Sequence, residues 1–274
     1  MAGLVEQHSH ITVRGLTHVY GVDGTALTAL AEVDFAVRRG EFVSVIGPSG
    51  GGKTTLLKVI GGLLQPTSGT VAIDGARPED AQLLKRIGFV FQEPALLPWK
   101  TVTQNVRLPM EINHGKTPLD MGATGRLIET VGLDEFGDYY PHQLSGGMRQ
   151  RVAFARALVT DPEVLLMDEP LGSLDEITRT SMRYELLKVW EALPKTIVLV
   201  THSITEAVMM SDRVVVLSSR PGRVVGEISI GLPRPREEAL ERAPEFLELV
   251  DRVKELLALG AKRTTTAGGA LAGS

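Results

Sequence analysis

The sequence predicts an α/β fold, in which a mainly parallel β-sheet is interrupted by a helical insertion. Four short apolar runs predict strands, at residues 41–47, 163–170, 196–202 and 213–218. Runs that are apolar on both faces are typical of a buried parallel sheet. Residues 41–63 show the order strand, glycine-rich stretch, helix. Between residues 101 and 160 the apolar spacing becomes mostly helical, which predicts the insertion.

The remaining elements follow from turn residues and periodicity. In chain order we expect a loose leader (1–10), short β-type segments (11–37), a strand closed by a turn (69–75), another strand (87–91) and two clear helices (127–133 and 148–158). After residue 218 we expect a turn (220–222), a strand-like segment (224–230), an amphipathic helix (241–260) and a disordered tail (261–274). Phe246, Val250, Val253 and Leu257 share one face of that helix.

Composition excludes several classes of protein. The 274 residues are 43% apolar and 23% charged, which is ordinary for a globular chain able to bury a core. The net charge of −4 argues against a nucleic-acid binder with a strongly basic surface. The absence of cysteine excludes disulfides, thiolate zinc sites and cysteine nucleophiles. No apolar run is long enough to span a bilayer and no signal peptide begins the chain, so we expect an intracellular protein.

The stretch GPSGGGKTT at residues 47–55 is the strongest functional signal. It fits the pattern G-x-x-x-x-G-K-[ST] between a predicted strand and a predicted helix. We expect its residues to bind phosphate groups: Gly47, Pro48, Ser49, Gly50, Gly51, Gly52, Lys53, Thr54 and Thr55. Glycines let backbone N–H groups approach phosphate oxygens, Lys53 reaches the outer phosphates, and the Thr54 hydroxyl can ligate Mg²⁺. The alternative is a glycine-rich turn with no ligand.

Two carboxylates follow the apolar strand Val164–Met167. Asp168 stands at the carboxyl end of that strand, where a Mg²⁺ partner is expected beside a phosphate loop. Glu169 is next along the chain and can polarise an attacking water. Taken alone, the same residues would be a charged turn after a strand.

A second serine and glycine stretch precedes the helix predicted at 148–158. LSGGM comprises Leu144, Ser145, Gly146, Gly147 and Met148. A hydroxyl, unsatisfied N–H groups and a helix dipole suit a second anion site. The alternative is a simple helix cap, because serine is a good N-cap residue.

Together these motifs resemble the nucleotide-binding subunit of an ATP-binding-cassette (ABC) transporter, over residues 11–218. The resemblance implies a P-loop NTPase core, an N-terminal antiparallel β subdomain and an α-helical signature subdomain, within an ATPase domain at 11–240. LSGGM resembles the family signature, although Met148 replaces the usual glutamine. In this family the signature faces the γ-phosphate held by the other subunit. The resemblance therefore implies a head-to-tail pair of copies with ATP sandwiched between them.

Further residues match family elements in the expected order. Tyr20 matches the aromatic that stacks on adenine, and Gln92 matches the glutamine that senses Mg²⁺ and contacts the permease. His202 matches the histidine that contacts the γ-phosphate, although Ser203 follows it where aspartate is commoner. The loop that communicates across the dimer matches Ser173, Leu174 and Asp175. The resemblance thus implies ATP hydrolysis by Glu169, His202 and Lys53, with Mg²⁺ held by Thr54, Gln92 and Asp168.

Transport requires a partner, because no segment spans a membrane. Leu96, Leu97 and Trp99 follow Gln92 and are candidates to dock a permease helix, or else form an ordinary buried loop. Four segments resemble the nitrate, sulfonate and taurine importers: residues 91–106, 185–191, 206–236 and 244–257. That branch implies uptake of a small anion through a separate permease, an extracytoplasmic solute-binding protein and a location at the cytoplasmic face of the cell membrane.

Three alternatives stay open at this stage. The importer could serve another small solute, such as a pyrimidine precursor. A soluble ABC protein acting on nucleic acid or ribosomes usually carries two cassettes or basic insertions, whereas this chain has one cassette and a net charge of −4. In a P-loop kinase or switch GTPase, residues 144–148 would only cap a helix.

Overall fold

The structure is a computed structural model that describes residues 9–22, 25–112, 121–192 and 195–268. The chain divides into two units. The first unit comprises residues 1–83 and 196–274, and the second comprises residues 84–195.

An antiparallel sheet opens the first unit. Its strand order is β2 (Thr25–Arg38), β1 (Ser9–Val22), β4 (Ser68–Ile73). Val13 pairs with Phe35 on one side and with Val71 on the other. The short β-type segments predicted over 11–37 are in fact parts of two long strands, because register shifts such as that between Val13 and Leu16 absorb the breaks in the pattern. The first strand already includes residues 9 and 10 of the predicted leader.

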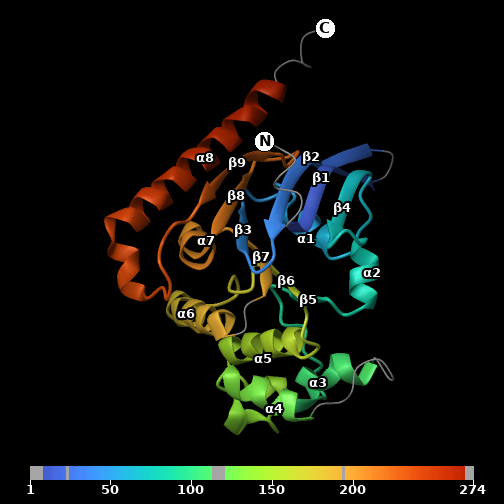
Figure 1. Cartoon of the computed structure of the whole chain (residues 1–274), viewed down its shortest axis with the longest axis vertical. Helices are drawn as coiled ribbons and strands as arrows, with labels where there is room; N and C mark the ends of the chain where they lie inside the picture. The colour runs from blue at the N-terminus through green and yellow to red at the C-terminus, as the bar shows by residue number, and fades with distance from the viewer. Residues whose placement is uncertain (1–8, 23–24, 113–120, 193–194, 269–274) are drawn as a thin grey trace. The chain divides into compact units, whose positions relative to one another are not determined.

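A parallel sheet forms the centre of the first unit (Figure 1). β3 (Phe42–Ile46) pairs in parallel with β7 (Thr196–Thr201) and with β8 (Arg213–Leu217), and β9 (Val224–Ser229) pairs antiparallel to β8. Every residue of β3 and β7 is buried. The sequence prediction of a buried parallel core is therefore confirmed, because strands covered on both faces need no polar alternation.

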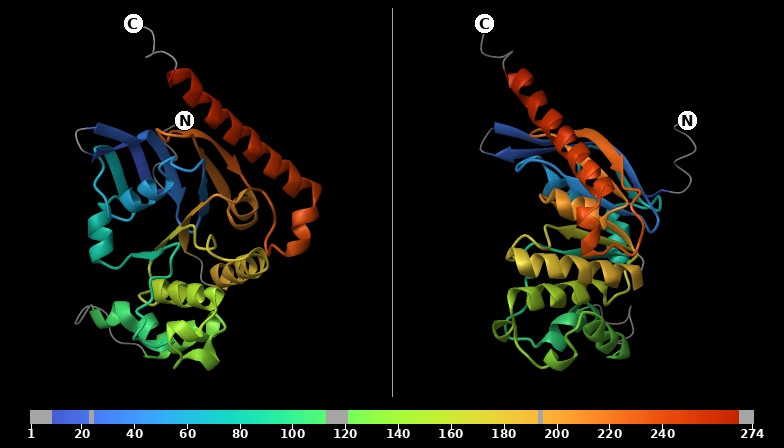
Figure 2. Two further views of the ribbon diagram at one scale, coloured as in Figure 1. Left: turned by 180° about the vertical axis from the view of Figure 1, so that it is seen from behind. Right: turned by 90° about the vertical axis from the view of Figure 1, so that its left-hand side faces the viewer.

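Helices complete the first unit: α1 (Lys53–Ile60), α2 (Pro78–Leu83), α7 (Ile204–Met210), the 3₁₀ turn η5 (Glu238–Arg242) and α8 (Pro244–Gly268). α8 runs along β8 and β9 and past α7 (Figure 2). Its buried side chains include Phe246, Leu249 and Val253. The helix predicted at 241–260 starts later and ends later, so the predicted tail at 261–274 is helical as far as Gly268. Ala261, Lys262 and Arg263 are good helix formers, which favours this extension.

The second unit contains two parallel strands and the helical insertion. β5 (Ile87–Val90) pairs with β6 (Val164–Asp168), and the helices are α3 (Val102–Ile112), α4 (Met121–Thr130), α5 (Gly146–Leu158) and α6 (Glu176–Ala192). Two 3₁₀ turns, η3 (Asp134–Phe136) and η4 (Pro141–Gln143), lie between α4 and α5. None of the helices in the described ranges is long and apolar enough to cross a membrane.

Candidate functional site

The phosphate loop, defined here as residues 47–55, joins β3 to α1. Gly50 and Gly52 have φ angles of 76° and 81°, in the left-handed region that favours glycine. Lys53 is the first residue of α1, and no acidic side chain lies in the first turn of that helix. The amino-terminal N–H groups and positive dipole end of α1 therefore meet the loop, which is the arrangement that binds anions.

The loop glycines are also required by the protein's own backbone. A Cβ on Gly52 would lie 2.6 Å from Leu30 Cδ2 and 2.7 Å from the Ala29 carbonyl oxygen. A Cβ on Gly51 would lie 2.7 Å from the Ser218 carbonyl oxygen. Residues of β2 and the residue after β8 therefore leave no room for a Cβ at these two positions. This close packing is a second reason for glycine, besides the approach of phosphate groups.

The Lys53 side chain is held at the phosphate loop by hydrogen bonds to two backbone carbonyl oxygens of the loop. Its side chain is largely buried (7% exposed), and Nζ donates to the carbonyl oxygens of Gly47 at 2.9 Å and Pro48 at 3.1 Å. Thr54, next along, is exposed. The ammonium group is therefore held as a fixed positive charge within the loop, which is what an outer phosphate requires.

Tyr20 and His202 belong to the same unit as this loop. The Tyr20 hydroxyl is 3.1 Å from Thr55 Oγ1. In the β3–β7 ladder, Ile46 pairs with Thr201, so the residues that follow them, Gly47 and His202, leave the sheet at the same edge. The His202 side chain is exposed. The structure thus brings the phosphate loop and His202 to one edge of the parallel sheet, while Tyr20, on the antiparallel sheet, contacts Thr55 of the loop.

A polar network that sequence analysis missed surrounds the backbone of His202. Thr201 Oγ1 donates to the buried Glu206 carboxylate at 2.5 Å, and it accepts from Ser203 N–H at 3.0 Å. Ser203 Oγ accepts from Glu206 N–H at 3.3 Å and so caps α7. Serine therefore performs the capping role where the family more often has aspartate. The spacing Ser203-x-x-Glu206 is a capping-box pattern, which is the signal that would have found it.

In the second unit, Asp168 and Glu169 lie at the carboxyl end of β6. Met167 pairs with Val90, so the ends of β5 and β6 are adjacent. Asp168 is buried, whereas Glu169 is half-buried and has a φ of 45°, a strained backbone conformation for a residue with a side chain. Such strain occurs often at functional sites.

Gln92 and Glu169 reach the same space beside Gly172. A Cβ on Gly172 would lie 3.3 Å from Gln92 Nε2 and 3.5 Å from a Glu169 carboxylate oxygen. Two of the predicted polar residues of this unit therefore approach the same glycine, although they lie far apart in the sequence. Gly172 itself was not singled out by sequence analysis.

The LSGGM stretch begins α5. Ser145 is exposed, and its Oγ accepts from Met148 N–H at 3.2 Å, so serine does cap the helix. A Cβ on Gly146 would lie 3.4 Å from Leu174 Cδ2, which places the stretch beside the loop 173–175 of the same chain. The cap leaves the Ser145 side chain exposed at the positive end of α5, where an anion from another molecule can meet it.

Asp175 caps the next helix. Its Oδ1 accepts from Thr178 N–H at 3.0 Å, and hydrogen bonding from Thr178 lowers the pKa of the carboxyl group. Leu174 is buried, whereas Ser173 and Asp175 are exposed. The loop is thus anchored by one apolar residue between two polar residues that face solvent.

The Gln92 loop, defined here as residues 92–100, leads from β5 to α3. Trp99 is 69% exposed, but Leu96 and Leu97 are half-buried. In the same unit a groove of about 470 Å³ is lined mainly by apolar residues and by two cationic ones, Lys85 and Arg156. Its apolar lining includes Phe89, Phe91, Leu108, Pro109 and Ile112. Sequence analysis missed these groove residues because they come from three separate elements.

Comparison with known proteins decides the family. Residues 30–172, just over half of the chain, match the family described as ABC transporter. The chain belongs to that family. A nitrate import ATP-binding protein, NrtD of Synechocystis sp., is 40% identical over 90% of this chain and 95% of its own length. An aliphatic sulfonates import protein, SsuB of Bacillus cereus, is 40% identical over 88% and 94%, and a taurine import protein, TauB of Pelagibacter ubique, is 40% identical over 85% and 89%.

A solved structure shares the fold of this ABC cassette. The dimeric, post-hydrolysis cassette MJ0796 with bound ADP and Pi has a TM-score of 0.71 and 35% identity, over 81% of this chain and all of that one. The predicted fold class, a P-loop NTPase core with an antiparallel β subdomain and a helical signature subdomain, is therefore confirmed. The chain is an ATP-hydrolysing subunit coupled to transport, and it falls in the importer-type branch.

Proposed function

We propose that the chain hydrolyses ATP to drive uptake of a small anion, such as nitrate, a sulfonate or taurine, through a separate membrane permease. The observation that supports the proposal is that one chain has two separate helix starts with the backbone and residue types that suit an anion. One is the phosphate loop before α1, and the other is the exposed Ser145 at the start of α5. A single ATP needs only one such loop for its phosphates, so the second is available to a nucleotide held by another copy.

The donor set fits Mg²⁺. Thr54 offers a hydroxyl, Asp168 a carboxylate and Gln92 an amide oxygen, which are the hard oxygen ligands that Mg²⁺ prefers. When bound, Mg²⁺ would neutralise charge on the phosphate oxygens. The proposal requires these residues to act on the same nucleotide as Lys53.

Hydrolysis follows from positioning and charge. Glu169 is the proposed base that takes a proton from the attacking water, and His202 contacts the γ-phosphate and steadies that water. Negative charge that spreads over the γ-phosphate is offset by Lys53 and by Ser145 of the partner subunit. Tyr20 stacks on the adenine ring.

The proposed assembly is a head-to-tail dimer that binds a permease. The solved cassette MJ0796, which shares the fold of this chain, is dimeric, and this supports the head-to-tail dimer. The likeness to import proteins supports the binding of a permease, as does the finding that no described helix could span a membrane. Gln92, Leu96, Leu97 and Trp99 are the proposed permease contacts, beside the groove that contains Arg156. The subunit would then lie at the cytoplasmic face of the cell membrane.

The solute is inferred from relatives alone. The nitrate, sulfonate and taurine relatives have equal identity to this chain, so they favour a small anion without choosing among them. An extracytoplasmic solute-binding protein would deliver it. A pyrimidine precursor stays the alternative within the same branch.

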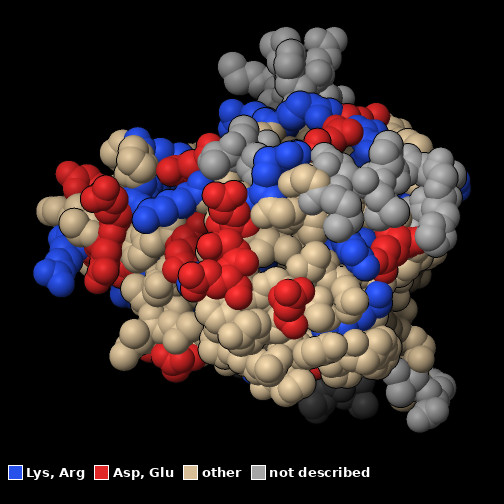
Figure 3. Space-filling model, turned by 90° about the horizontal axis from the view of Figure 1, so that it is seen from below, with Lys and Arg blue, Asp and Glu red and all other residues tan. Residues whose placement is uncertain are grey.

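The net charge of −4 favours transport over nucleic-acid binding. On the face in Figure 3, acidic side chains lie among the basic ones and a broad area carries neither. A phosphate backbone needs clustered lysine and arginine instead. The proposal therefore includes no nucleic-acid partner.

The deciding experiment measures the size of a hydrolysis-deficient variant. Glu169→Gln, purified and given saturating Mg²⁺ and ATP, should become a dimer by light scattering and return to a monomer when ATP is removed. A chain that stays monomeric in ATP, alone and with its permease, overturns the proposal. Wild-type protein with ADP serves as the control.

A further inference from the structure

The Gln92 loop has a conformation that its own sequence does not favour. Ala95 has a φ of 45°, in the left-handed region that a residue with a Cβ avoids. Between residues 92 and 99 the chain forms neither helix nor strand. Contacts from outside the loop must therefore hold it in this shape.

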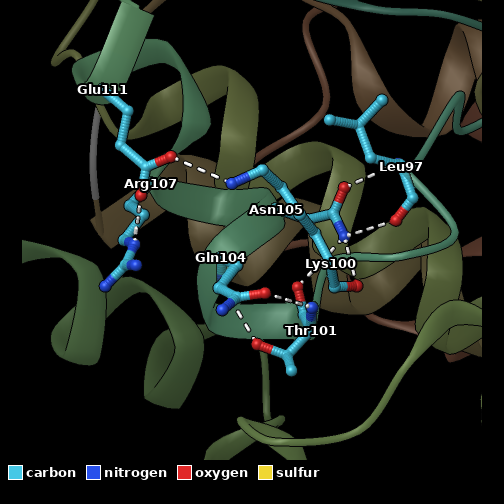
Figure 4. A network of polar contacts seen from close by, with 7 residues as sticks. All are labelled: Leu97, Lys100, Thr101, Gln104, Asn105, Arg107 and Glu111. Atoms are coloured by element: carbon cyan, nitrogen blue, oxygen red, sulfur yellow. Dashed lines mark hydrogen bonds and ion pairs between the residues drawn. The ribbon is translucent and has the colours of Figure 1, made fainter.

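Asn105 on α3 holds the end of the loop (Figure 4). The side chain is fully buried (0% exposed). Its amide oxygen accepts from Leu97 N–H at 2.8 Å, and its Nδ2 donates to the carbonyl oxygens of Leu97 at 3.2 Å, Lys100 at 2.9 Å and Thr101 at 3.0 Å. Only an amide side chain offers both a donor and an acceptor in this geometry, so no apolar or acidic residue of similar size replaces it.

Arg156 on α5 holds the beginning of the loop. Its Nη1 donates to the Ala95 carbonyl at 2.8 Å and its Nη2 to the Pro94 carbonyl at 2.5 Å. No carboxylate pairs with Arg156 within the part of the chain that the structure describes. The guanidinium therefore serves the loop backbone, including the strained residue, rather than an ion pair.

Ser145 is the N-cap residue of the same helix. Gln150, between Ser145 and Arg156, donates from Nε2 to the Phe91 carbonyl at 3.2 Å. α5 thus contacts the Gln92 loop and the residue just before it with two side chains. The 13 residues of α5 form one continuous helix, and a rigid helix of this kind can transmit a displacement from one end to the other.

We propose that Asn105 and Arg156 are positioning residues that hold the Gln92 loop in one conformation and make it follow α5. When Ser145 engages a nucleotide of the second copy, the loop residues that face the permease move with the helix. The inference rests on the proposed function, in which Ser145 meets ATP and this loop meets the permease. The attachment of the loop to Asn105 and Arg156 rests only on the hydrogen bonds of those two side chains.

The loop contains its own reporter. The chain has two tryptophans, and Trp99 is exposed in the loop while Trp190 is buried on α6. In a Trp190→Phe background, emission and acrylamide quenching report on Trp99 alone. We expect Asn105→Leu and Arg156→Met each to raise quenching of Trp99 without nucleotide. Exchange of the Leu97 amide should accelerate about tenfold in Asn105→Leu, as expected for one lost hydrogen bond.

Matched controls separate positioning from stability. Arg151→Met removes another half-buried guanidinium from α5, one that pairs with Glu185 rather than with the loop. Thr103→Val removes a bond from α3 to the Gly137 carbonyl. Both controls should lower the melting temperature yet leave the Trp99 signal unchanged. Arg156→Lys, which keeps a charge, should restore part of the signal if Arg156→Met folds poorly.

The nucleotide response tests the second half of the inference. With Glu169→Gln added, Mg²⁺ and ATP should shift Trp99 emission, and the shift should be lost in Asn105→Leu and Arg156→Met while ATP affinity stays within about twofold. Equal Trp99 changes in the controls and the loop variants overturn the inference, as does an unchanged signal in the loop variants. If the chain fails to dimerise in ATP, the proposed function is overturned instead. Acrylamide quenching of Trp99 without nucleotide then still tests whether Asn105 and Arg156 hold the loop.

Discussion

The phosphate loop and the Gln92 loop differ in how they are held. The phosphate loop takes its shape from its own glycines, which let its backbone turn and pass close to Leu30 and Ser218, and from the helix that starts at Lys53. The Gln92 loop takes its shape from two polar side chains outside it, Asn105 on the helix that follows the loop and Arg156 on α5, 61 positions after Ala95. A loop that must bind one invariant ligand can be encoded locally, whereas a loop that must respond to another site gains from attachment to the helix that reaches that site.

The largest expected effect separates binding from chemistry. Glu169→Gln should lower kcat about 10²–10⁴-fold because a general base is lost, while ATP affinity stays near that of the parent. Stopped-flow phosphate release and equilibrium ATP binding measure the two quantities. Glu163→Gln is the matched control, since it removes a carboxylate next to the other end of β6 that pairs with Arg86. Near-normal hydrolysis by Glu169→Gln would rule out its role as base.

The next effect tests whether α5 meets a nucleotide. Ser145→Asp keeps a good N-cap and suits the helix dipole, so it should fold as well as the parent. Its added negative charge should repel the γ-phosphate of the second copy and lower kcat by about 10²-fold or more. Steady-state ATP hydrolysis measures kcat, and the melting temperature shows whether the variant folds as well as the parent. If Ser145 only caps the helix, as in a kinase or GTPase, activity will be unchanged.

A smaller effect tests what the Gln92 loop contacts. Leu97→Glu should weaken the complex with the permease about 10- to 100-fold, because a carboxylate enters an apolar contact, and should leave ATP binding intact. Co-purification with the permease in detergent measures it. Leu247→Glu, at an exposed position on α8, is the control and should retain the complex. Retention of the complex by Leu97→Glu would count against docking at this loop.

The smallest effect concerns the ion pairs at the end of the Gln92 loop. Burial alone would raise the pKa of Glu111, but hydrogen bonds from Lys100 and Arg107 outweigh it and lower that pKa (Figure 4). The stabilisation is therefore complete above the ordinary glutamate pKa and is lost as the pH falls through the lowered one. Glu111→Gln should reduce the free energy of unfolding by about 0.2–1 kcal/mol at neutral pH. Urea denaturation of both proteins should show this difference disappear in acid; a difference that persists there excludes the carboxylate as its source.

Short-range patterns predicted much of the fold and of the site. Apolar runs predicted the buried strands β3, β6, β7 and β8, and the spacing Gly47 to Thr54 predicted the strand–loop–helix order. The extent of β1 and of α8 was predicted less well, because bulges and helix ends depend on tertiary packing and on propensity that short windows underestimate. The roles assigned to Glu169, His202 and Ser145 stay predictions.

The sequence by itself determined the fold class, the family and the phosphate loop, because periodicity and glycine placement act between residues that are close along the chain. Only the tertiary structure decided that Gln92 and Glu169 both approach Gly172, and that Asn105 and Arg156 hold the Gln92 loop. These contacts join residues on separate elements. Lone side chains carry no pattern, so only the packing of those elements brings their polar atoms within hydrogen-bonding distance.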